Sequence, residues 1–535
     1  MRTAQVPHTY RIAGLSLLTV TCLVLVWWKT LTYPYIQDDW FYLYQVAHGN
    51  FMEVLKNAFS PFDKLHYRPF NTLFFLFSYK LLGLNSIGYH LLALSMHYCN
   101  ALLIVFIIRK IDGSPLIAWC TGLLYCTAAT IHMEPLLWAV GIQALGCALF
   151  FYVSLALFLQ KHYKLSSLSF LLSLLFQEGS LFLPSVVFFY ILLQDDGVSH
   201  AHILRKVTEK LWPFCLVLGF YFVLKMLGTG YLGTPESNPY KVKLFGPHVL
   251  RNCLFYLTWV AETVLPWKDI PFGTRQPHVW KMEFPLLSQT ASLFLIAAAV
   301  LFIAAVGCVI SWRRRIIASR NNKLLIFWLV WFLGSIGPAL FFPIQIYRYY
   351  LTFASLPFIV IILTCLKRTA LFFKVQEQRF ARFIICYTAL LIISSFFYFF
   401  KCDQEGIHHI YRGGYNNLIK KGHIVRRVWE GLLTAHSTLP RNAVLVFEEL
   451  DTLWAIGFLD GPRLWYEDET LMIVYRKILK SDSRGIYFDD PISIRVTPLD
   501  TGIKSSGRIY LDPGKTFVFR FQDGYLREHA VSHIM

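Results

Sequence analysis

Eleven apolar runs dominate this chain of 535 residues and constrain its fold more than any other feature. A helix of about 20 apolar residues crosses a membrane with all of its backbone hydrogen bonds made internally. The runs lie at 12–31, 87–108, 115–131, 135–159, 165–177, 179–194, 211–229, 289–311, 324–342, 349–366 and 383–400. The two runs between 165 and 194 are short for a full crossing and fit one broken hairpin. We therefore predict an α-helical polytopic membrane protein with about 11 transmembrane helices.

The positive charge of the chain is concentrated in short loops between the apolar runs. Lys and Arg total 50 against 32 acids, which gives a net charge of +18, yet residues 401–535 are almost neutral. Basic clusters such as Arg109-Lys110 and Lys367-Arg368 mark cytoplasmic loops, because short loops rich in Lys and Arg stay inside. We expect a multi-pass protein of the plasma (inner) membrane, with a cytoplasmic N-terminus and an extracytoplasmic C-terminal domain. The charge does not indicate nucleic-acid binding, since no basic stripe alternates with aromatic residues outside the membrane part.

Two domains are predicted. Residues 1–400 form a transmembrane module with two outer loops at 32–86 and 230–288, where outer means extracytoplasmic. We expect the first loop to contain short amphipathic helices that lie in the interface, and a juxtamembrane helix from Phe70 to Leu82 that does not cross. The second loop is expected to form a partly ordered lid over the membrane face.

Residues 401–535 form a predicted soluble extracytoplasmic domain of the α/β or α+β type. The apolar spacing predicts a helix over Asn417–Ala435 and a buried strand over Ala443–Phe447. A second helix is predicted over Leu471–Leu479. The alternation in Phe517–Phe521 predicts a strand, and the following Asp523-Gly524 is a hairpin turn signal.

Asp38 and Asp39 follow the first apolar run within a few residues. At a membrane–water boundary a carboxylate can stay ionised while it faces a lipid-soluble substrate. A general base of this kind could take the proton of an attacking hydroxyl group, with the second acid as its neighbour, positioner or metal ligand. The competing interpretation, two solvated acids after a helix end, is about equally probable from position alone.

Two arginines lie between aromatic residues on the predicted outer side. Arg68 is part of Tyr67-Arg68-Pro69, and Arg348 follows Tyr347 at the start of another apolar run. A guanidinium group makes bidentate hydrogen bonds to phosphate, and an arginine at such a place is costly unless it meets an anion or reaches water. A shared phosphate site formed by Arg68, Arg348 and Tyr347 is therefore plausible, with interfacial snorkelling as the alternative.

Further candidates are His132, Glu134 and Glu178. His132 and Glu134 share one short outer turn and could assist an acceptor or bind a divalent metal, although a satisfied turn explains the spacing as well. Glu178 falls where two short runs meet, and acids at membrane depth are usually functional. His90 and His97, seven residues apart, are more simply interpreted as a polar stripe that faces the bundle.

These motifs, taken in order, resemble those of GT-C glycosyltransferases, which include protein O-mannosyltransferases, lipid A aminoarabinose transferases and TMTC-like bacterial members. The segment from Tyr33 to Asp39, followed by Tyr67-Arg68-Pro69, resembles their first outer loop. His132-x-Glu134 with Trp138 looks like their second acidic motif. Gln177-Glu178 looks like their Lys-Glu motif with glutamine in place of lysine, and Arg348-Tyr349 looks like their late Arg-Tyr segment.

The resemblance implies an inverting glycosyltransferase that uses a polyprenyl-phosphate-linked sugar. It implies that Asp38 is the catalytic acid with Asp39 beside it, and that Arg68 and Arg348 bind the lipid-linked phosphate. Glu134 would assist the acceptor or a metal. The acceptor could be a lipid, a glycan or a protein. No cofactor is certain, and a divalent metal held by Asp39 and Glu134 remains open.

Two other classes of protein fit some of these features. A transporter or flippase for an anionic lipid or glycan would also use arginines and intramembrane acids, but it usually contains broken helices in both halves. Only one broken hairpin, near 177–179, is visible here. A non-catalytic protein of envelope-glycan assembly is the third possibility.

Overall fold

The computed structural model describes most of the chain. The described residues are 8–62, 67–194, 200–229, 242–266, 320–343, 346–405, 416–448, 450, 453–475, 478–482, 485–488, 492–494, 503–505, 513–522 and 525–529. Structural statements below refer to these residues. The predicted apolar run at 289–311 and most of the predicted lid at 230–288 lie outside them.

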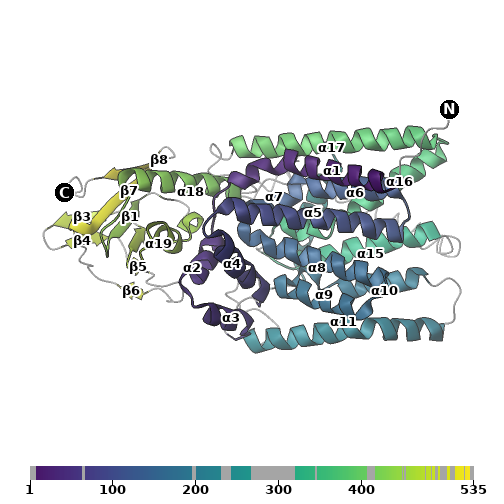
Figure 1. Ribbon diagram of the computed structural model, residues 1–535, viewed down its shortest axis with the longest axis horizontal. Coiled ribbons are helices and arrows are strands. Elements are labelled where there is room, and N and C mark those ends of the chain that lie inside the picture. Colours follow the sequence, from purple (N-terminus) through teal and green to yellow (C-terminus); the bar gives the residue numbers. More distant parts are fainter. Residues whose placement is uncertain are drawn as a thin grey trace.

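A bundle of long apolar helices forms most of the molecule (Figure 1). Within the described residues, seven helices are long and apolar enough to cross a membrane, and eight if one bent pair counts as a single span. The bent pair is α6 (Pro115–Thr127) with α7 (Ala129–Leu137), which meet at 50°. The others are α1 (His8–Trp27), α5 (Ser86–Ile111), α8 (Ile142–Leu159), α11 (His200–Thr229), α15 (Arg320–Leu340), α16 (Ser355–Phe372) and α17 (Glu377–Glu405).

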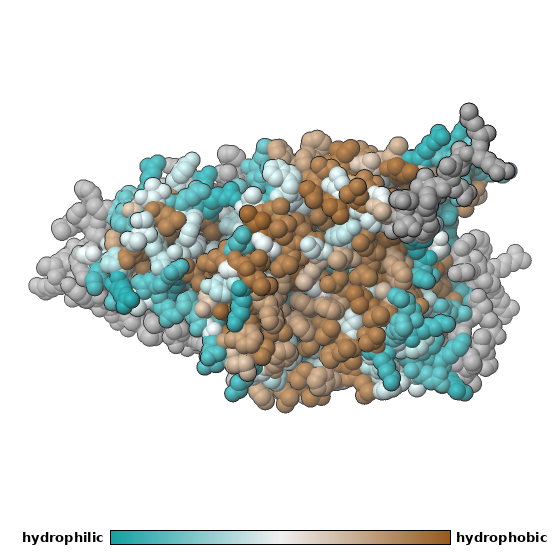
Figure 2. Space-filling view, in the orientation of Figure 1, coloured by the Kyte–Doolittle hydropathy of each residue, from teal (hydrophilic) through white to brown (hydrophobic). Residues whose placement is uncertain are grey.

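Two shorter apolar helices correspond to the two short predicted runs between 165 and 194. They are α9 (Tyr163–Phe176) and α10 (Leu183–Gln194), and the short 3-10 helix η3 (Glu178–Ser180) lies between them. The broken hairpin predicted near 165–194 is confirmed. The predicted fold class, an α-helical polytopic protein, is confirmed for the described residues, and the surface of the bundle is largely apolar between more polar ends (Figure 2).

Helix α8 lies inside the bundle and α11 lies at its edge. In an 18-residue apolar stretch within Ala139–Leu159, 72% of the residues are buried, against 11% in a stretch of the same length within Leu204–Leu227 of α11. Small residues allow this enclosure, because helices in a membrane associate by close packing. A Cβ atom at Gly146 would lie 2.7 Å from the ring of Phe176 on α9. The start of α8 is therefore surrounded by other elements, and it is there that the polar residues gather.

Three short helices cover one end of the bundle. They are α2 (Asp38–His48), α3 (Phe51–Phe59) and α4 (Pro69–Leu82). Helix α4 begins with proline and ends at Gly83, whose φ of 57° suits glycine. The predicted short helices of the first outer loop are confirmed. In the second outer loop the structure describes one helix, α12 (Pro247–Ala261).

The C-terminal segment contains helix α18 (Asn416–Ala435) and a mixed sheet at the same end of the bundle (Figure 1). The order of the sheet is β2-β1-β7-β8, with β1 parallel to both β2 and β7, and β7 antiparallel to β8. Its strands are β1 (Val444–Glu448), β2 (Met472–Tyr475), β7 (Thr516–Gln522) and β8 (Tyr525–His529). The predicted helix 417–435, the strand 443–447 and the strand 517–521 are confirmed. The predicted α/β or α+β character is confirmed as well.

The smaller elements of this segment complete the description. Helix α19 (Asp460–Tyr466) and the 3-10 helix η6 (Leu453–Ile456) follow β1. Strands β3 (Ile478–Asp482) and β4 (Gly485–Phe488) form one two-stranded sheet, and β5 (Ile492–Ile494) and β6 (Ile503–Ser505) form another.

The predicted helix over 471–479 is wrong. This stretch forms β2 and the start of β3, and β2 pairs in parallel with β1, with Leu445 opposite Ile473. Ile473 and Val474 are both buried. Their branched side chains fit a buried strand, and pairing with β1 outweighs the helical spacing of the sequence.

The C-terminal segment and the first outer loop share one hydrophobic core. Trp40 and Leu43 of α2 and Phe75 of α4 belong to the same buried cluster as Val428 of α18 and Leu445 of β1. The first outer loop therefore has its orientation fixed from two sides, by the bundle and by the C-terminal segment.

Candidate functional site

The segment from Thr130 to Cys147 brings the predicted site residues together. It runs from α7 into the start of α8, and groups along it contact residues from four distant parts of the chain. These contacts join Thr130 to Arg348, Glu134 to Tyr349, Ala139 and Val140 to Asp39, Gln143 to Arg68, and Cys147 to Gln177. Residues as far apart in the sequence as Asp39 and Tyr349 thus share one end of the bundle.

Asp39 is fully buried and holds backbone in place. Its carboxylate accepts hydrogen bonds from the backbone N–H groups of Ile36 at 2.9 Å, Val140 at 2.8 Å and Ala139 at 3.3 Å. Burial raises the pKa of Asp39, and the three N–H groups act in the opposite direction. Asp39 therefore fixes the first outer loop to the 3-10 helix η2 (Ala139–Gly141), which directly precedes α8.

Asp38 has different surroundings from its neighbour. In the described part of the chain no group donates a hydrogen bond to its carboxylate. It lies in the first turn of α2, where the helix dipole favours a negative charge. Burial raises the pKa of Asp38 to about 6, while the positive charges of Lys421 and Arg68 lower it. Asp38 is thus a carboxylate that is close to cations and available to a ligand.

Backbone strain directly precedes Asp38. Gln37 has φ 55° and ψ −123°, a conformation that a residue with a side chain rarely adopts. Its N–H donates to the carbonyl of Ala455 at 3.0 Å. Such strain costs on the order of 1–3 kcal/mol and persists when the surroundings enforce it. The direction of the Asp38 side chain therefore depends on the C-terminal segment.

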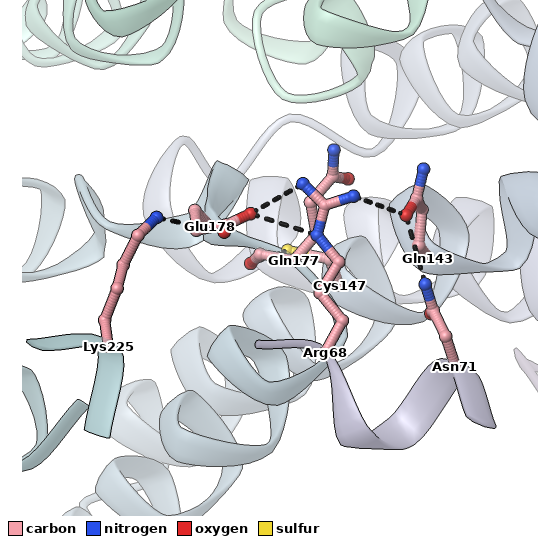
Figure 3. A network of polar contacts seen from close by, with 7 residues as sticks. All are labelled: Arg68, Asn71, Gln143, Cys147, Gln177, Glu178 and Lys225. Atoms are coloured by element: carbon pink, nitrogen blue, oxygen red, sulfur yellow. Dashed lines mark hydrogen bonds and ion pairs between the residues drawn. The ribbon is translucent and has the colours of Figure 1, made fainter. Parts of the chain in front are cut away.

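Arg68 lies at the centre of a polar cluster (Figure 3). Its Nη2 and Nε donate to Oε2 of Glu178 at 2.8 and 3.2 Å, and its Nη1 donates to Gln143 at 2.8 Å. Asn71, one turn into α4, donates to the same Gln143 oxygen at 3.0 Å. The guanidinium plane is consequently held in one orientation by α8 and η3.

Lys225 adds a second cation to this cluster. Its Nζ lies 3.2 Å from Oε1 of Glu178, on the side opposite Arg68 (Figure 3). One carboxylate therefore lies between two cations, and the three groups carry one excess positive charge. In a site of low dielectric constant an excess charge is costly unless an anion accompanies it. The cluster is thus suited to bind one negative charge.

Arg348 forms an ion pair inside the protein, whereas the sequence suggested that it shares a phosphate site with Arg68. It is 2% exposed, its Nη1 lies 2.9 Å from Oε2 of the fully buried Glu262, and it stacks over Trp259 at 4.7 Å. The charge of Arg348 is therefore balanced within the protein. This ion pair fixes the 3-10 helix η5 (Arg348–Thr352), whose Tyr349 N–H donates to Glu134 at 3.3 Å.

Tyr349 and Tyr42 connect these parts of the site. Tyr349 interacts electrostatically with Arg68, as does Tyr42, which also lies beside Asn71. Tyr347 stacks on Tyr349 with ring centres 5.2 Å apart. Asp38, Arg68 and Glu178 thus line one region that is bordered by aromatic residues. The ion pair of Arg348 with Glu262 lies outside this region and supports it by holding η5.

His132 does not join this region. It is fully buried, and its ring packs against those of His97 and Tyr125 at 4.4 and 4.5 Å. The interpretation of His90 and His97 as a polar stripe is confirmed, because both bond to backbone carbonyls inside the bundle. Among the described residues, no three His, Cys, Asp or Glu side chains are grouped so that they could hold a metal ion. The backbone bonds of Asp39 also leave it poorly suited to ligate one.

Sequence reasoning missed Lys225, Gln143, Glu262 and Lys421. Lys225 did carry a signal, because a lysine inside an apolar run is unusual and points to function. Gln143 lies in a run that is otherwise apolar. Glu262 carried the same kind of signal, because it is the one charged residue of the apolar stretch 254–267, whereas Lys421 comes from a segment of ordinary polar composition.

No protein-family model and no curated protein matches this chain. Among solved structures the chain is similar to ArnT from Cupriavidus metallidurans bound to undecaprenyl phosphate, with 11% identity, a TM-score of 0.48 and 86% of each chain covered. The apo form of the same protein matches with 12% identity and a TM-score of 0.38, again over 86% of each chain. ArnT is an aminoarabinose transferase of the GT-C superfamily.

Proposed function

We propose that this protein is an inverting glycosyltransferase of the GT-C type. It moves a sugar from a polyprenyl-phosphate-linked donor to a hydroxyl group of a lipid, glycan or protein at the outer face of the membrane. The observation that carries this proposal is the Asp38 carboxylate, which receives no hydrogen bond from the described residues and lies beside a cationic cluster. An unbonded base next to an anion site is what transfer from a phosphate-linked sugar needs.

The donor phosphate binds at Arg68 and Lys225. A polyprenyl tail stays among lipid chains while its phosphate lies at the end of the apolar helices, where this cluster is. A phosphodiester carries one negative charge, which balances the one excess positive charge of Arg68, Lys225 and Glu178. Tyr349 and Tyr42 flank the phosphate.

Transfer takes place in one displacement. Asp38 accepts the proton of the acceptor hydroxyl, whose oxygen forms a bond to the anomeric carbon of the sugar. The bond from that carbon to the phosphate oxygen breaks, and the phosphate leaves with the electron pair, so that the configuration inverts. The cations stabilise the charge that develops on the leaving phosphate. Asp39, Arg348, Glu134 and Glu178 act as positioning residues: Asp39 and Glu134 accept backbone N–H groups, Arg348 is paired with the buried Glu262, and Glu178 holds Arg68 and Lys225 in place.

Substitution of Asp38 tests this function. We expect Asp38→Asn to reduce transfer by about 10²- to 10⁴-fold, the usual contribution of a general base. Because the base acts in its ionised form and its pKa is about 6, transfer by the wild type should also fall as the pH drops below 6. The measurement is mass spectrometry of envelope lipids and glycoproteins from deletion cells that produce the wild type or the variant.

Glu53→Gln is the matched control, because Glu53 is an exposed acid on α3 of the same outer loop. Both variants must reach the membrane at wild-type levels. A glycoform lost with Asp38→Asn and kept with Glu53→Gln supports the transferase. An unchanged glycoform pattern in Asp38→Asn overturns the role of Asp38 and favours a flippase.

A further inference from the structure

The C-terminal segment is packed directly against the loop that carries Asp38. A Cβ atom at Gly422 of α18 would lie 2.9 Å from the ring of Tyr33. Arg426, one turn further along α18, donates to the carbonyl of Thr32 at 2.8 Å. The start of α18 therefore rests on the backbone that leads into Asp38, and no gap separates the two.

Two more contacts tie the C-terminal segment to α2. The carbonyl of Ala455 accepts the N–H of the strained Gln37. Gly457, with φ 65°, makes room for Trp40, because a Cβ atom there would lie 2.4 Å from that of Trp40. The residue before Asp38 and the residue two after it are thus both held by the C-terminal segment.

Lys421 of α18 is a charged side chain that is buried where the C-terminal segment packs against the loop before Asp38. It is 9% exposed, although lysine is normally solvated. Burial lowers the pKa of Lys421 to about 8, and the acid that acts in the opposite direction is Asp38. A buried ammonium group needs an anion to balance it. The carboxylate whose charge acts on Lys421 is that of Asp38.

We propose that Lys421 is a positioning residue of the site, an ammonium group from the C-terminal segment that keeps Asp38 ionised and directed toward the substrate. This inference deepens the proposed function and rests on it for its catalytic meaning. The charged and titratable groups that face Asp38 are Lys421 of α18, Arg68 at the start of α4, and Asp39 and Tyr42 of α2. Lys420 faces Lys421 from the same helix.

Chemical modification of Asp38 tests this without any knowledge of the sugar or the acceptor. Dicyclohexylcarbodiimide reacts with protonated carboxyl groups in apolar surroundings. The purified full-length protein is treated with it between pH 4 and pH 9, and mass spectrometry follows the loss of the unmodified peptide that contains Asp38. The Asp38→Asn variant assigns the pH-dependent part of this loss to Asp38 and not to the adjacent Asp39.

For the wild type we expect the labelling of Asp38 to have its midpoint near pH 6. For Lys421→Met we expect the midpoint of labelling to lie about one pH unit higher, because an opposite charge nearby lowers the pKa of an acid by about that much or more. Lys421→Arg should keep the wild-type midpoint. Lys420→Met is the matched control, because it removes the neighbouring lysine of the same helix, and it should leave the midpoint in place. Size-exclusion chromatography verifies folding, and Lys421→Gln replaces Lys421→Met if the latter aggregates.

An unchanged midpoint in the folded Lys421 variants overturns the proposal, as does an equal shift in Lys420→Met. The labelling needs no substrate, so this failure is separate from that of the proposed function. If Asp38→Asn abolishes transfer while the midpoint is insensitive to Lys421, only the role of Lys421 is lost. If Asp38→Asn transfers normally, Asp38 is not the general base and that part of the proposed function fails, whatever the midpoint of labelling shows.

Discussion

At the start of α2, two neighbouring carboxylates lie in different surroundings. Three backbone N–H groups occupy Asp39, whereas the described residues donate no hydrogen bond to Asp38. Successive residues of a helix point about 100° apart. The Asp38 side chain therefore faces Arg68 and Lys421, while the Asp39 side chain faces the segment directly before α8. The sequence placed both acids at the membrane boundary, but it could not tell which of them is structural.

A similar division separates the two arginines. Both lie between aromatic residues in the sequence, yet Arg348 is balanced by Glu262, whereas Arg68 shares Glu178 with Lys225. Lys225 approaches Glu178 from α11, so the second cation of this cluster comes from a residue 47 positions further along the chain than its partner.

Loss of Lys225 should weaken the binding of a lipid phosphate. For Lys225→Gln we expect about tenfold weaker binding of undecaprenyl phosphate, or about 1.4 kcal/mol, because one charge-assisted contact is removed. Binding is measured by native mass spectrometry, with undecaprenol as the uncharged comparison. Lys210→Gln, about four turns before Lys225 on the same helix, is the control. Equal affinity of Lys225→Gln and the wild type for the phosphate would contradict the anion site.

At the scale of elements, α8 and the C-terminal segment position the site together. The start of α8 receives Asp39 and Arg68, and α18 and η6 hold the loop before Asp38. The predicted elements were mostly correct because long apolar runs and amphipathic helices have clear periodicities. Residues 471–479 were misassigned because a short apolar run fits both helix and strand, and only its pairing with β1 decides between them.

The close approach of Gly457 to Trp40 can be tested directly. We expect Gly457→Ala to lower the melting temperature and to reduce transfer, because the new Cβ atom clashes with Trp40 and φ of 65° is strained for alanine. The cost should be on the order of 1–3 kcal/mol. Gly219→Ala on α11 is the control, since nothing lies within 4 Å of a Cβ atom there. Wild-type stability and transfer in Gly457→Ala would show that this contact does not position α2.

At the scale of the whole molecule, the site, the short helices α2–α4 and the C-terminal sheet lie at one end of the bundle (Figure 1). The basic loop between α16 and α17 lies at the other end. From the positive-inside bias we propose that this basic end faces the cytoplasm. The proposed outer position of the site then follows from geometry, because helices of this length connect one side of a bilayer to the other.

Accessibility labelling tests this orientation. Single cysteines are introduced at Glu53 on α3, at Tyr525 on β8 and at Gln376 between α16 and α17, in a variant whose native cysteines are serine. We expect a membrane-impermeant maleimide to label the cysteines at 53 and 525 in intact cells, and the cysteine at 376 only after permeabilisation. Labelling of 53 and 376 from the same side would contradict the arrangement of the bundle across the membrane.

The sequence by itself determined that this chain forms a helical membrane protein, where most of its apolar helices lie, and which end of them carries acids and arginines. These properties follow from local composition and periodicity, which can be read within a single helical turn or a single apolar run. Only the tertiary structure decided that Asp39 holds backbone, that Glu262 balances Arg348, and that Lys225 and Lys421 join the site. Such pairings depend on the energy of burying one charge beside another, and the partners come from segments that no local pattern connects.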